Sequence, residues 1–131
     1  MSRTILLIED NEQNRYLTAF LLERRGYTVV SADDGPRGIE LARSLAPDLI
    51  LLDIQLPGMD GYAVARALRE IPALRATPVI SVTSYAMVGD RERSLAAGCN
   101  GYIEKPINPE TFVGEIERFI PPSRPGAAAS P

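Results

Sequence analysis

The sequence predicts an α/β fold in which five parallel strands alternate with five helices. Five short apolar runs alternate with five segments whose apolar residues recur at the three- and four-residue spacing of a helix. The middle three runs are unbroken or nearly so, which is typical of parallel strands covered on both faces. Glycine and proline mark the boundaries between these segments. We therefore expect an open, doubly wound (βα)5 sheet with the strand order 2-1-3-4-5.

The first half of the chain supplies three of the predicted strands, at residues 4–8, 28–31 and 48–52. The helix after the first strand presents Leu17, Phe20 and Leu21 on one face and ends before Gly26. The helix after the second strand begins near Pro36, since proline is well suited to a first helical turn, and it ends before Pro47.

The second half supplies strands at residues 78–82 and 100–104. Val64, Leu68 and Ile71 mark the third helix, and Phe112, Ile116 and Phe119 mark the fifth. The fifth helix is predicted to start at Asn108-Pro109-Glu110, which has the order of an N-cap, a first helical residue and a first-turn acid.

The fourth helix, which ends before Gly98, differs from the others in having few apolar residues. Leu95 is its one large apolar anchor, and Met87 and Val88 stand just before it. So little apolar burial predicts a weakly held element that shifts at low cost, although an ordinary exposed helix has the same pattern.

Length and composition restrict both organisation and function. A chain of 131 residues is long enough for one core, which we place at residues 1–120, with 121–131 as a flexible tail rich in proline and alanine. The net charge of −3 argues against nucleic acid as a partner. No apolar run has membrane length and no leader is evident, so we expect a cytoplasmic protein.

Two absences restrict the chemistry further. The chain has no histidine, which excludes histidine-based catalytic triads and histidine-ligated zinc. Its single cysteine, Cys99, cannot form an internal disulfide and is interpreted as a packing residue. Any catalysis by this chain therefore uses carboxylates, hydroxyls, its one lysine or a hard metal ion.

Polar residues gather at the carboxyl ends of four predicted strands. These ends carry Glu9 and Asp10, Asp53, Thr83, and Lys105, which is the only lysine among 14 basic residues. The expected strand order brings them together around Asp53. Three carboxylates and one ammonium leave a net charge of about −2, which a bound cation would relieve. Oxygen ligands of this kind suit Mg²⁺.

This set of residues also suits phosphoryl chemistry. A carboxylate can attack phosphorus and form an aspartyl phosphate. The transferred group then needs a metal ion, an ammonium and hydroxyl donors in fixed places. Asp10, Asp53, Thr83 and Lys105 together with a metal ion would meet these needs.

At this point the sequence resembles a response-regulator receiver domain over residues 3–120. The resemblance is carried by Ile8-Glu9-Asp10-Asn11, Leu52-Asp53-Ile54-Gln55-Leu56-Pro57-Gly58-Met59-Asp60-Gly61, Val82-Thr83-Ser84 and Gly101-Tyr102-Ile103-Glu104-Lys105-Pro106. It implies a flavodoxin-like or CheY-like fold. The segments 86–93 and 97–99 are most similar to stand-alone, single-domain regulators of the DivK type, and receivers of hybrid kinases share much of this pattern.

The resemblance implies a role for each residue of the set. Asp53 would accept a phosphoryl group from a phosphohistidine, Lys105 would pair with a phosphoryl oxygen, and Thr83 would hydrogen-bond another. Tyr102 would swing inward as Thr83 moves, which would change the surface formed by the fourth helix, the fifth strand and the fifth helix. The resemblance also implies that Asp10, Asp53 and the Gln55 carbonyl would hold Mg²⁺, or Mn²⁺ in its place, with Glu9 acting through water. It further implies a cis peptide bond between Lys105 and Pro106.

Three residues depart from the most frequent pattern of such domains. Ser84 stands where many receivers have alanine, and its hydroxyl offers Thr83 a competing partner. Gln55 and Tyr85 flank the path of water to the phosphoryl group, and both are larger than the smallest residues found there. We hypothesise that the bulk of Tyr85 gives a long-lived phosphorylated form.

The implied partners are a sensor histidine kinase or a histidine phosphotransfer protein, and a downstream protein target. The protein would be a monomer or a weak dimer, and not an enzyme beyond its own phosphorylation and slow dephosphorylation. Two alternatives remain open at this stage. One is a receiver-like interaction module that is not phosphorylated. The other is a Mg²⁺-dependent phosphohydrolase, which usually has a second acid where this chain has Gln55.

Overall fold

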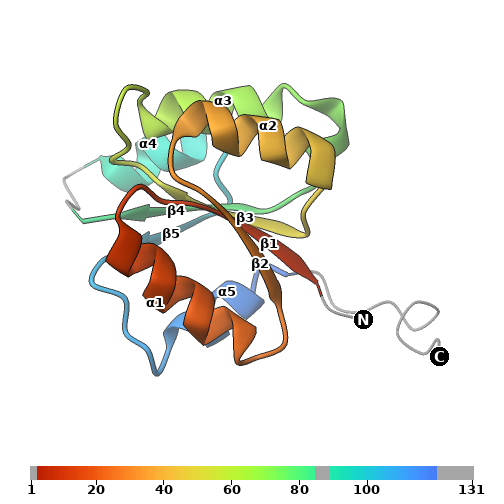
Figure 1. Cartoon of the computed structure of the whole chain (residues 1–131). Helices are drawn as coiled ribbons and strands as arrows, with labels where there is room; N and C mark the ends of the chain where they lie inside the picture. The colour runs from red at the N-terminus through yellow and green to blue at the C-terminus, as the bar shows by residue number, and fades with distance from the viewer. Residues whose placement is uncertain (1–2, 85–88, 121–131) are drawn as a thin grey trace.

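The computed structural model describes residues 3–84 and 89–120, and within these ranges the chain forms the predicted five strands and five α-helices (Figure 1). The strands are β1 (Thr4–Ile8), β2 (Thr28–Ala32), β3 (Leu49–Asp53), β4 (Val79–Thr83) and β5 (Gly101–Glu104). The helices are α1 (Glu12–Glu23), α2 (Gly35–Leu45), α3 (Gly61–Arg69), α4 (Asp90–Ala96) and α5 (Phe112–Glu117), with a short 3₁₀ helix at Pro72–Leu74. All strand pairs are parallel and their order is β2-β1-β3-β4-β5, which confirms the predicted topology.

The helices cover the sheet on both faces. Figure 1 shows α2, α3 and α4 on one face and α1 and α5 on the other. Alternate residues of the central strands point to opposite faces, so Ile50 and Leu52 pack with α3 while Leu49 and Leu51 pack with α5. All five residues of β3 are buried, as its unbroken apolar run predicts.

Helix starts and ends follow local chemistry. The side chains of Asn11, Asp34 and Asp60 accept hydrogen bonds from the first turns of α1, α2 and α3. Pro36 lies in the first turn of α2, as predicted. The same helix ends at Ala46, whose φ of 48° places a side-chain-bearing residue in the left-handed region just before Pro47.

The predicted face of α1 is not the face that it buries. Leu22 and Thr18 are buried and Leu21 packs partly against the core, whereas Leu17 and Phe20 are exposed. Phe20 stacks on Tyr16, and the Arg24 guanidinium lies over the Phe20 ring. The apolar spacing identified the helix, but these contacts between residues of the same helix stabilise apolar side chains that face solvent.

The predicted anchor of α4 is also wrong. Leu95 is 50% exposed, and within the described part of this helix the buried residues are Asp90 and Ser94. Asp90 accepts a hydrogen bond from the Tyr62 hydroxyl at 3.2 Å, and Ser94 accepts one from Ser81 of β4 at 2.9 Å. Polar contacts therefore hold this helix to the rest of the domain. The other residues that the sequence suggested, Met87 and Val88, lie outside the described ranges.

Element boundaries differ from the predictions by one to three residues. β3 and β4 each extend one residue further, so Asp53 and Thr83 are the last residues of their strands. α5 begins at Phe112 rather than at Pro109, after a turn in which the Asn108 side chain accepts a hydrogen bond from the Glu110 N–H. The predicted tail at 121–131 lies outside the described residues. Among the residues that the structure describes, no helix is both long and apolar enough to span a membrane.

Candidate functional site

The predicted residues meet at the edge of the sheet where the parallel strands end. Glu9 follows β1, and its N–H donates to the Ala32 carbonyl of β2. Asp53 ends β3, in register with Val82 of the neighbouring strand. The Lys105 N–H donates to the Thr83 carbonyl at 2.8 Å, which fixes the lysine beside the end of β4. Main-chain hydrogen bonds therefore place Glu9, Asp53 and Lys105 at one edge of the sheet.

Lys105 bridges two carboxylates. Its Nζ lies 2.8 Å from Oε1 of Glu9 and 3.3 Å from Oδ2 of Asp53. The lysine side chain is 11% exposed and the two carboxylate side chains are almost completely buried. These contacts outweigh the effect of burial and raise the pKa of Lys105, so its ammonium stays charged. The peptide bond to Pro106 is cis, as the resemblance implies.

A third carboxylate completes an acidic cluster. Side-chain oxygens of Glu9, Asp10 and Asp53 lie within 4.8 Å of one another, and Asp10 is exposed while the other two are buried. Burial raises the pKa of Asp53 to about 7, and the hydrogen bond and negative charge of Glu9 add to this effect. One ammonium does not neutralise three carboxylates, so the donor set fits a hard divalent cation.

Main-chain contacts orient the loop that carries these acids. The Asn11 N–H donates to Oε2 of Glu9 at 3.2 Å. Arg15 of α1 donates to the carbonyls of Glu9 and Asp10 at 3.0 and 3.1 Å. The sequence analysis did not identify Arg15, because its partners are main-chain carbonyls that leave no side-chain pattern in a sequence.

Gln55 connects the end of β3 to the end of β4. Its N–H donates to Oδ1 of Asp53 at 3.0 Å. Its side-chain Nε2 donates to the Thr83 hydroxyl at 2.6 Å, and its Oε1 accepts from the Ser84 N–H at 3.1 Å. A competing partner for Thr83 is thus present, and it is the Gln55 amide. Tyr85, the second predicted modulator, lies outside the described residues.

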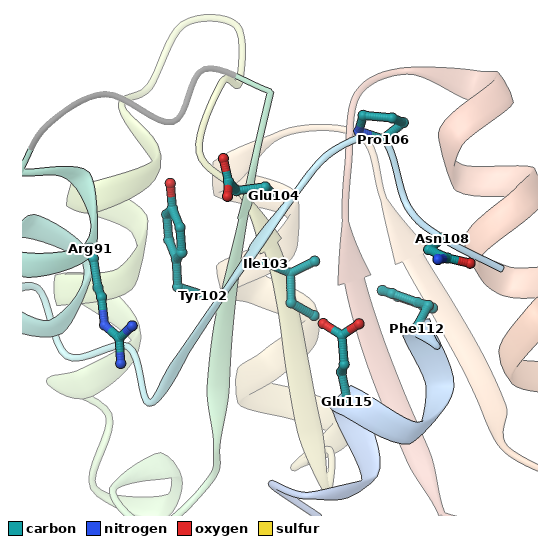
Figure 2. Close-up of a pocket in the computed structure, with 8 residues that line it drawn as sticks. All are labelled: Arg91, Tyr102, Ile103, Glu104, Pro106, Asn108, Phe112 and Glu115. Atoms are coloured by element: carbon teal, nitrogen blue, oxygen red, sulfur yellow. The ribbon is translucent and has the colours of Figure 1, made fainter. Parts of the chain in front are cut away.

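Tyr102 lines a cavity on the neighbouring face of the domain. The cavity has a volume of about 430 Å³ and lies between α4, β5 and α5 (Figure 2). Arg91 borders it from α4, and Phe112 and Glu115 border it from α5. Tyr102 is half-buried, so its ring contributes to this surface. The predicted switch residue therefore lies where a change in its position alters the surface formed by α4, β5 and α5.

This fold and this site define a class of α/β domain, a doubly wound sheet with an acidic cluster and a buried lysine at its strand ends. The particular family follows from comparison with known proteins. Residues 5–117 match the response regulator receiver domain. The chain belongs to this family, as the sequence resemblance predicted.

Curated relatives and solved structures agree with this assignment. The chain is 42% identical over 120 residues to the polar-differentiation response regulator DivK of Brucella ovis, which covers 92% of this chain and 98% of the relative. The chemotaxis protein CheY4 of Vibrio cholerae superposes with a TM-score of 0.87 at 27% identity, over 91% of this chain and 99% of that one. The receiver domain of a Pseudomonas aeruginosa sensor histidine kinase has a TM-score of 0.84 at 36% identity, over 92% and 98%, and has a magnesium ion in its active-site cleft.

The protein is therefore a receiver-domain response regulator of the DivK and CheY type. Receiver domains of this kind are signalling proteins of two-component systems, not metabolic enzymes, and they interact with histidine kinases and downstream targets.

Proposed function

We propose that Asp53 accepts a phosphoryl group from a phosphohistidine on a sensor histidine kinase or a histidine phosphotransfer protein. The observation that carries the proposal is the position of the Lys105 ammonium, 3.3 Å from Asp53 and 2.8 Å from Glu9 beside three clustered carboxylates. A single fixed cation beside a buried carboxylate suits a group that gains phosphoryl oxygens during a reaction.

The chemical step is a displacement at phosphorus. A carboxylate oxygen of Asp53 forms the new O–P bond while the P–N bond to the partner's histidine breaks, and the histidine nitrogen keeps the electron pair of that bond. Lys105 pairs with one phosphoryl oxygen and the Thr83 hydroxyl donates to another. Transfer requires the carboxylate form of Asp53, and a bound cation favours that form by opposing the effect of burial.

A divalent cation fits the acid cluster. Asp10, Asp53 and the main-chain carbonyl of Gln55 would hold Mg²⁺, with Glu9 acting through a water molecule, and Mn²⁺ would substitute. When bound, the ion supplies positive charge for the oxygens of the transferring phosphoryl group. Asp10 is exposed, so the ion would reach the cluster from the side of this carboxylate.

The signal leaves through the surface of α4, β5 and α5. Thr83 moves toward the phosphoryl group, Tyr102 turns inward, and the cavity beside it changes shape for a downstream protein target. The thin polar attachment of α4 supports this step, because it gives the helix few buried apolar contacts to lose when it shifts.

The remaining assignments follow from the family and the composition. Residues 1–120 form the receiver domain and 121–131 a flexible tail. The protein acts in the cytoplasm as a monomer or weak dimer, with protein partners and without nucleic acid or membrane contacts. Its only catalysis is its own phosphorylation and slow dephosphorylation.

The test is the intact mass of the protein after incubation with Mg²⁺ and acetyl phosphate. We expect wild type to gain one phosphoryl group and Asp53→Asn to gain none. Asp60→Asn is the matched control, because Asp60 caps α3 and lies outside the acid cluster. An equal gain in wild type and Asp53→Asn would contradict the proposed acceptor. Steady release of phosphate would favour a phosphohydrolase, and Mg²⁺ binding without any gain from either acetyl phosphate or a phosphorylated kinase would favour an interaction module.

A further inference from the structure

The Gln55 side chain makes a two-point contact with the end of β4. Its Nε2 donates to the Thr83 hydroxyl at 2.6 Å, and its Oε1 accepts from the Ser84 N–H at 3.1 Å. The Ser84 N–H can only donate, so the amide oxygen must face it and the amide nitrogen must face Thr83. The orientation of the amide is therefore set by its partners, and turning it over would place two donors against each other.

The same residue also touches the acceptor carboxylate. The Gln55 N–H donates to Oδ1 of Asp53, and this main-chain bond fixes where the side chain starts. Thr83 is held independently, because its carbonyl accepts from the Lys105 N–H. Gln55 thus spans the gap between the ends of β3 and β4, directly beside the carboxylate that is proposed to be phosphorylated.

A phosphoryl group on Asp53 would compete for the groups that Gln55 holds. Its three terminal oxygens need donors, and the end of β4 offers the Thr83 hydroxyl and the Ser84 N–H. The Ser84 N–H can make one well-aligned bond at a time, and Gln55 Oε1 occupies it. Because both contacts of Gln55 come from one planar amide, rotating the amide away to free Ser84 also breaks the contact with Thr83.

We propose that Gln55 is a positioning residue, a latch that holds Thr83 and Ser84 in the unphosphorylated arrangement and must release the Ser84 N–H when Asp53 is phosphorylated. The inference rests on the proposed function, and it assigns Gln55 a role separate from its bulk. Bulk slows the approach of water in dephosphorylation, whereas the latch opposes phosphorylation. The two effects predict different outcomes for different substitutions.

Gln55→Met separates the two effects, because methionine has a similar length but cannot form either hydrogen bond. Gln55→Ala removes the latch and the bulk together. We expect Gln55→Met to be phosphorylated by acetyl phosphate about fivefold faster than wild type, the factor expected when one modest hydrogen bond no longer has to be broken. Gln55→Ala should be dephosphorylated faster than Gln55→Met, because alanine also opens the path of water, while both should be phosphorylated faster than wild type.

Amide hydrogen exchange provides a readout that needs no phosphodonor. In wild type the Ser84 N–H should exchange about tenfold more slowly than in Gln55→Met, since its bonded partner is lost in the variant. Melting temperatures of both variants establish that they fold. Equal Ser84 exchange in wild type and Gln55→Met would overturn the contact, and equal phosphorylation rates would overturn the latch. A wild-type protein that gains no phosphoryl group would overturn the proposed function, whereas equal rates in a protein that is phosphorylated would overturn the latch alone.

Discussion

The Lys105 ammonium lies closer to Glu9 than to Asp53, at 2.8 Å against 3.3 Å. Glu9 therefore holds the lysine in place, and Asp53 shares it. In the unphosphorylated protein this arrangement keeps a buried cation beside the proposed acceptor while a second carboxylate makes the shorter contact with it. The site thus places the charge that phosphoryl oxygens need before they arrive.

Substituting Lys105 by arginine should damage switching more than metal binding. A guanidinium is a wide planar fork, and it cannot place one compact charge between Glu9 and Asp53 in a space where the lysine side chain is 11% exposed. We expect Mg²⁺ affinity to change by less than about threefold and phosphorylation-dependent binding of the downstream target to fall by about tenfold or more. Mg²⁺ titration and target binding, each with and without acetyl phosphate, measure the two effects. Wild-type target binding by Lys105→Arg would show that a point charge is not required.

Glu9→Gln should weaken Mg²⁺ binding, because it removes one of the three negative charges of the cluster. A loss of about tenfold is expected for a carboxylate that supports a metal site through water. Glu12→Gln is the matched control, since Glu12 is an exposed acid in the first turn of α1. Calorimetric titration with Mg²⁺ compares the two variants with wild type. Equal affinities for Glu9→Gln and Glu12→Gln would exclude Glu9 from the metal site.

The positions of the site residues could be predicted from the sequence, but some of their contacts could not. The alternation of apolar runs and helical segments predicts a doubly wound sheet, and the strand order expected of that topology brings Glu9, Asp53 and Lys105 together. The contacts of Gln55 with Thr83 and Ser84 could not be predicted, since they depend on a side-chain rotamer and a main-chain donor. The bond from Arg15 to main-chain carbonyls was missed for the same reason.

In the fold, likewise, the sequence predicted the elements but not all of their buried residues. Helical spacing identified α1 and α4, but Leu17 and Phe20 of α1 and Leu95 of α4 are exposed rather than buried. Hydrophobicity alone points to Leu95 in α4, whereas the structure buries Ser94 one residue before it. A hydrophobic pattern does not identify Ser94 as buried, because Ser94 is polar. Its burial depends on a hydrogen bond from Ser81, which lies on β4 and is distant in the sequence.

Because polar contacts hold α4, removing a hydroxyl that binds this helix should cost more stability than truncating its large apolar side chain. Tyr62→Phe removes the hydroxyl that donates to the buried Asp90, so it should lower the free energy of unfolding by about 1–2 kcal/mol. Leu95→Ala should change it by less than about 0.5 kcal/mol, because the side chain is half exposed. Urea unfolding followed by circular dichroism measures both values. A larger loss for Leu95→Ala than for Tyr62→Phe would mean that apolar contacts hold the helix.

Ala46→Gly should stabilise the protein. Ala46 ends α2 with a φ of 48°, a conformation that costs a residue with a Cβ about 1–2 kcal/mol. Glycine avoids this cost but gives the unfolded chain more freedom, so the net gain should be about 0.5–1 kcal/mol. Ala96→Gly is the control, since it places the same substitution in the helical conformation of α4 and should destabilise. A fall in the unfolding free energy of Ala46→Gly would contradict the assigned backbone conformation.

The titration of Asp53 predicts how stability and metal binding change with pH. Burial raises the pKa of its carboxyl to about 7, with the adjacent Glu9 adding to the rise, while in the unfolded chain an aspartate titrates near pH 4. Between these values the folded chain binds more protons than the unfolded chain. The stabilising contribution of this group is therefore complete below about pH 4 and is lost as the pH rises through about 7.

In the presence of a chelator, the melting temperature of wild type minus that of Asp53→Asn should accordingly decrease as the pH is raised from 5.5 to 8, because asparagine does not titrate. Mg²⁺ needs the carboxylate and competes with the proton, so the rise in wild-type melting temperature that it produces should be larger at pH 8 than at pH 5.5. Scanning calorimetry of both proteins, with Mg²⁺ and with chelator, measures the two trends. A difference between wild type and Asp53→Asn that stays constant across this range would mean that Asp53 is already ionised at pH 5.5. The Lys105 ammonium would then outweigh burial at the acceptor carboxylate even without a metal ion.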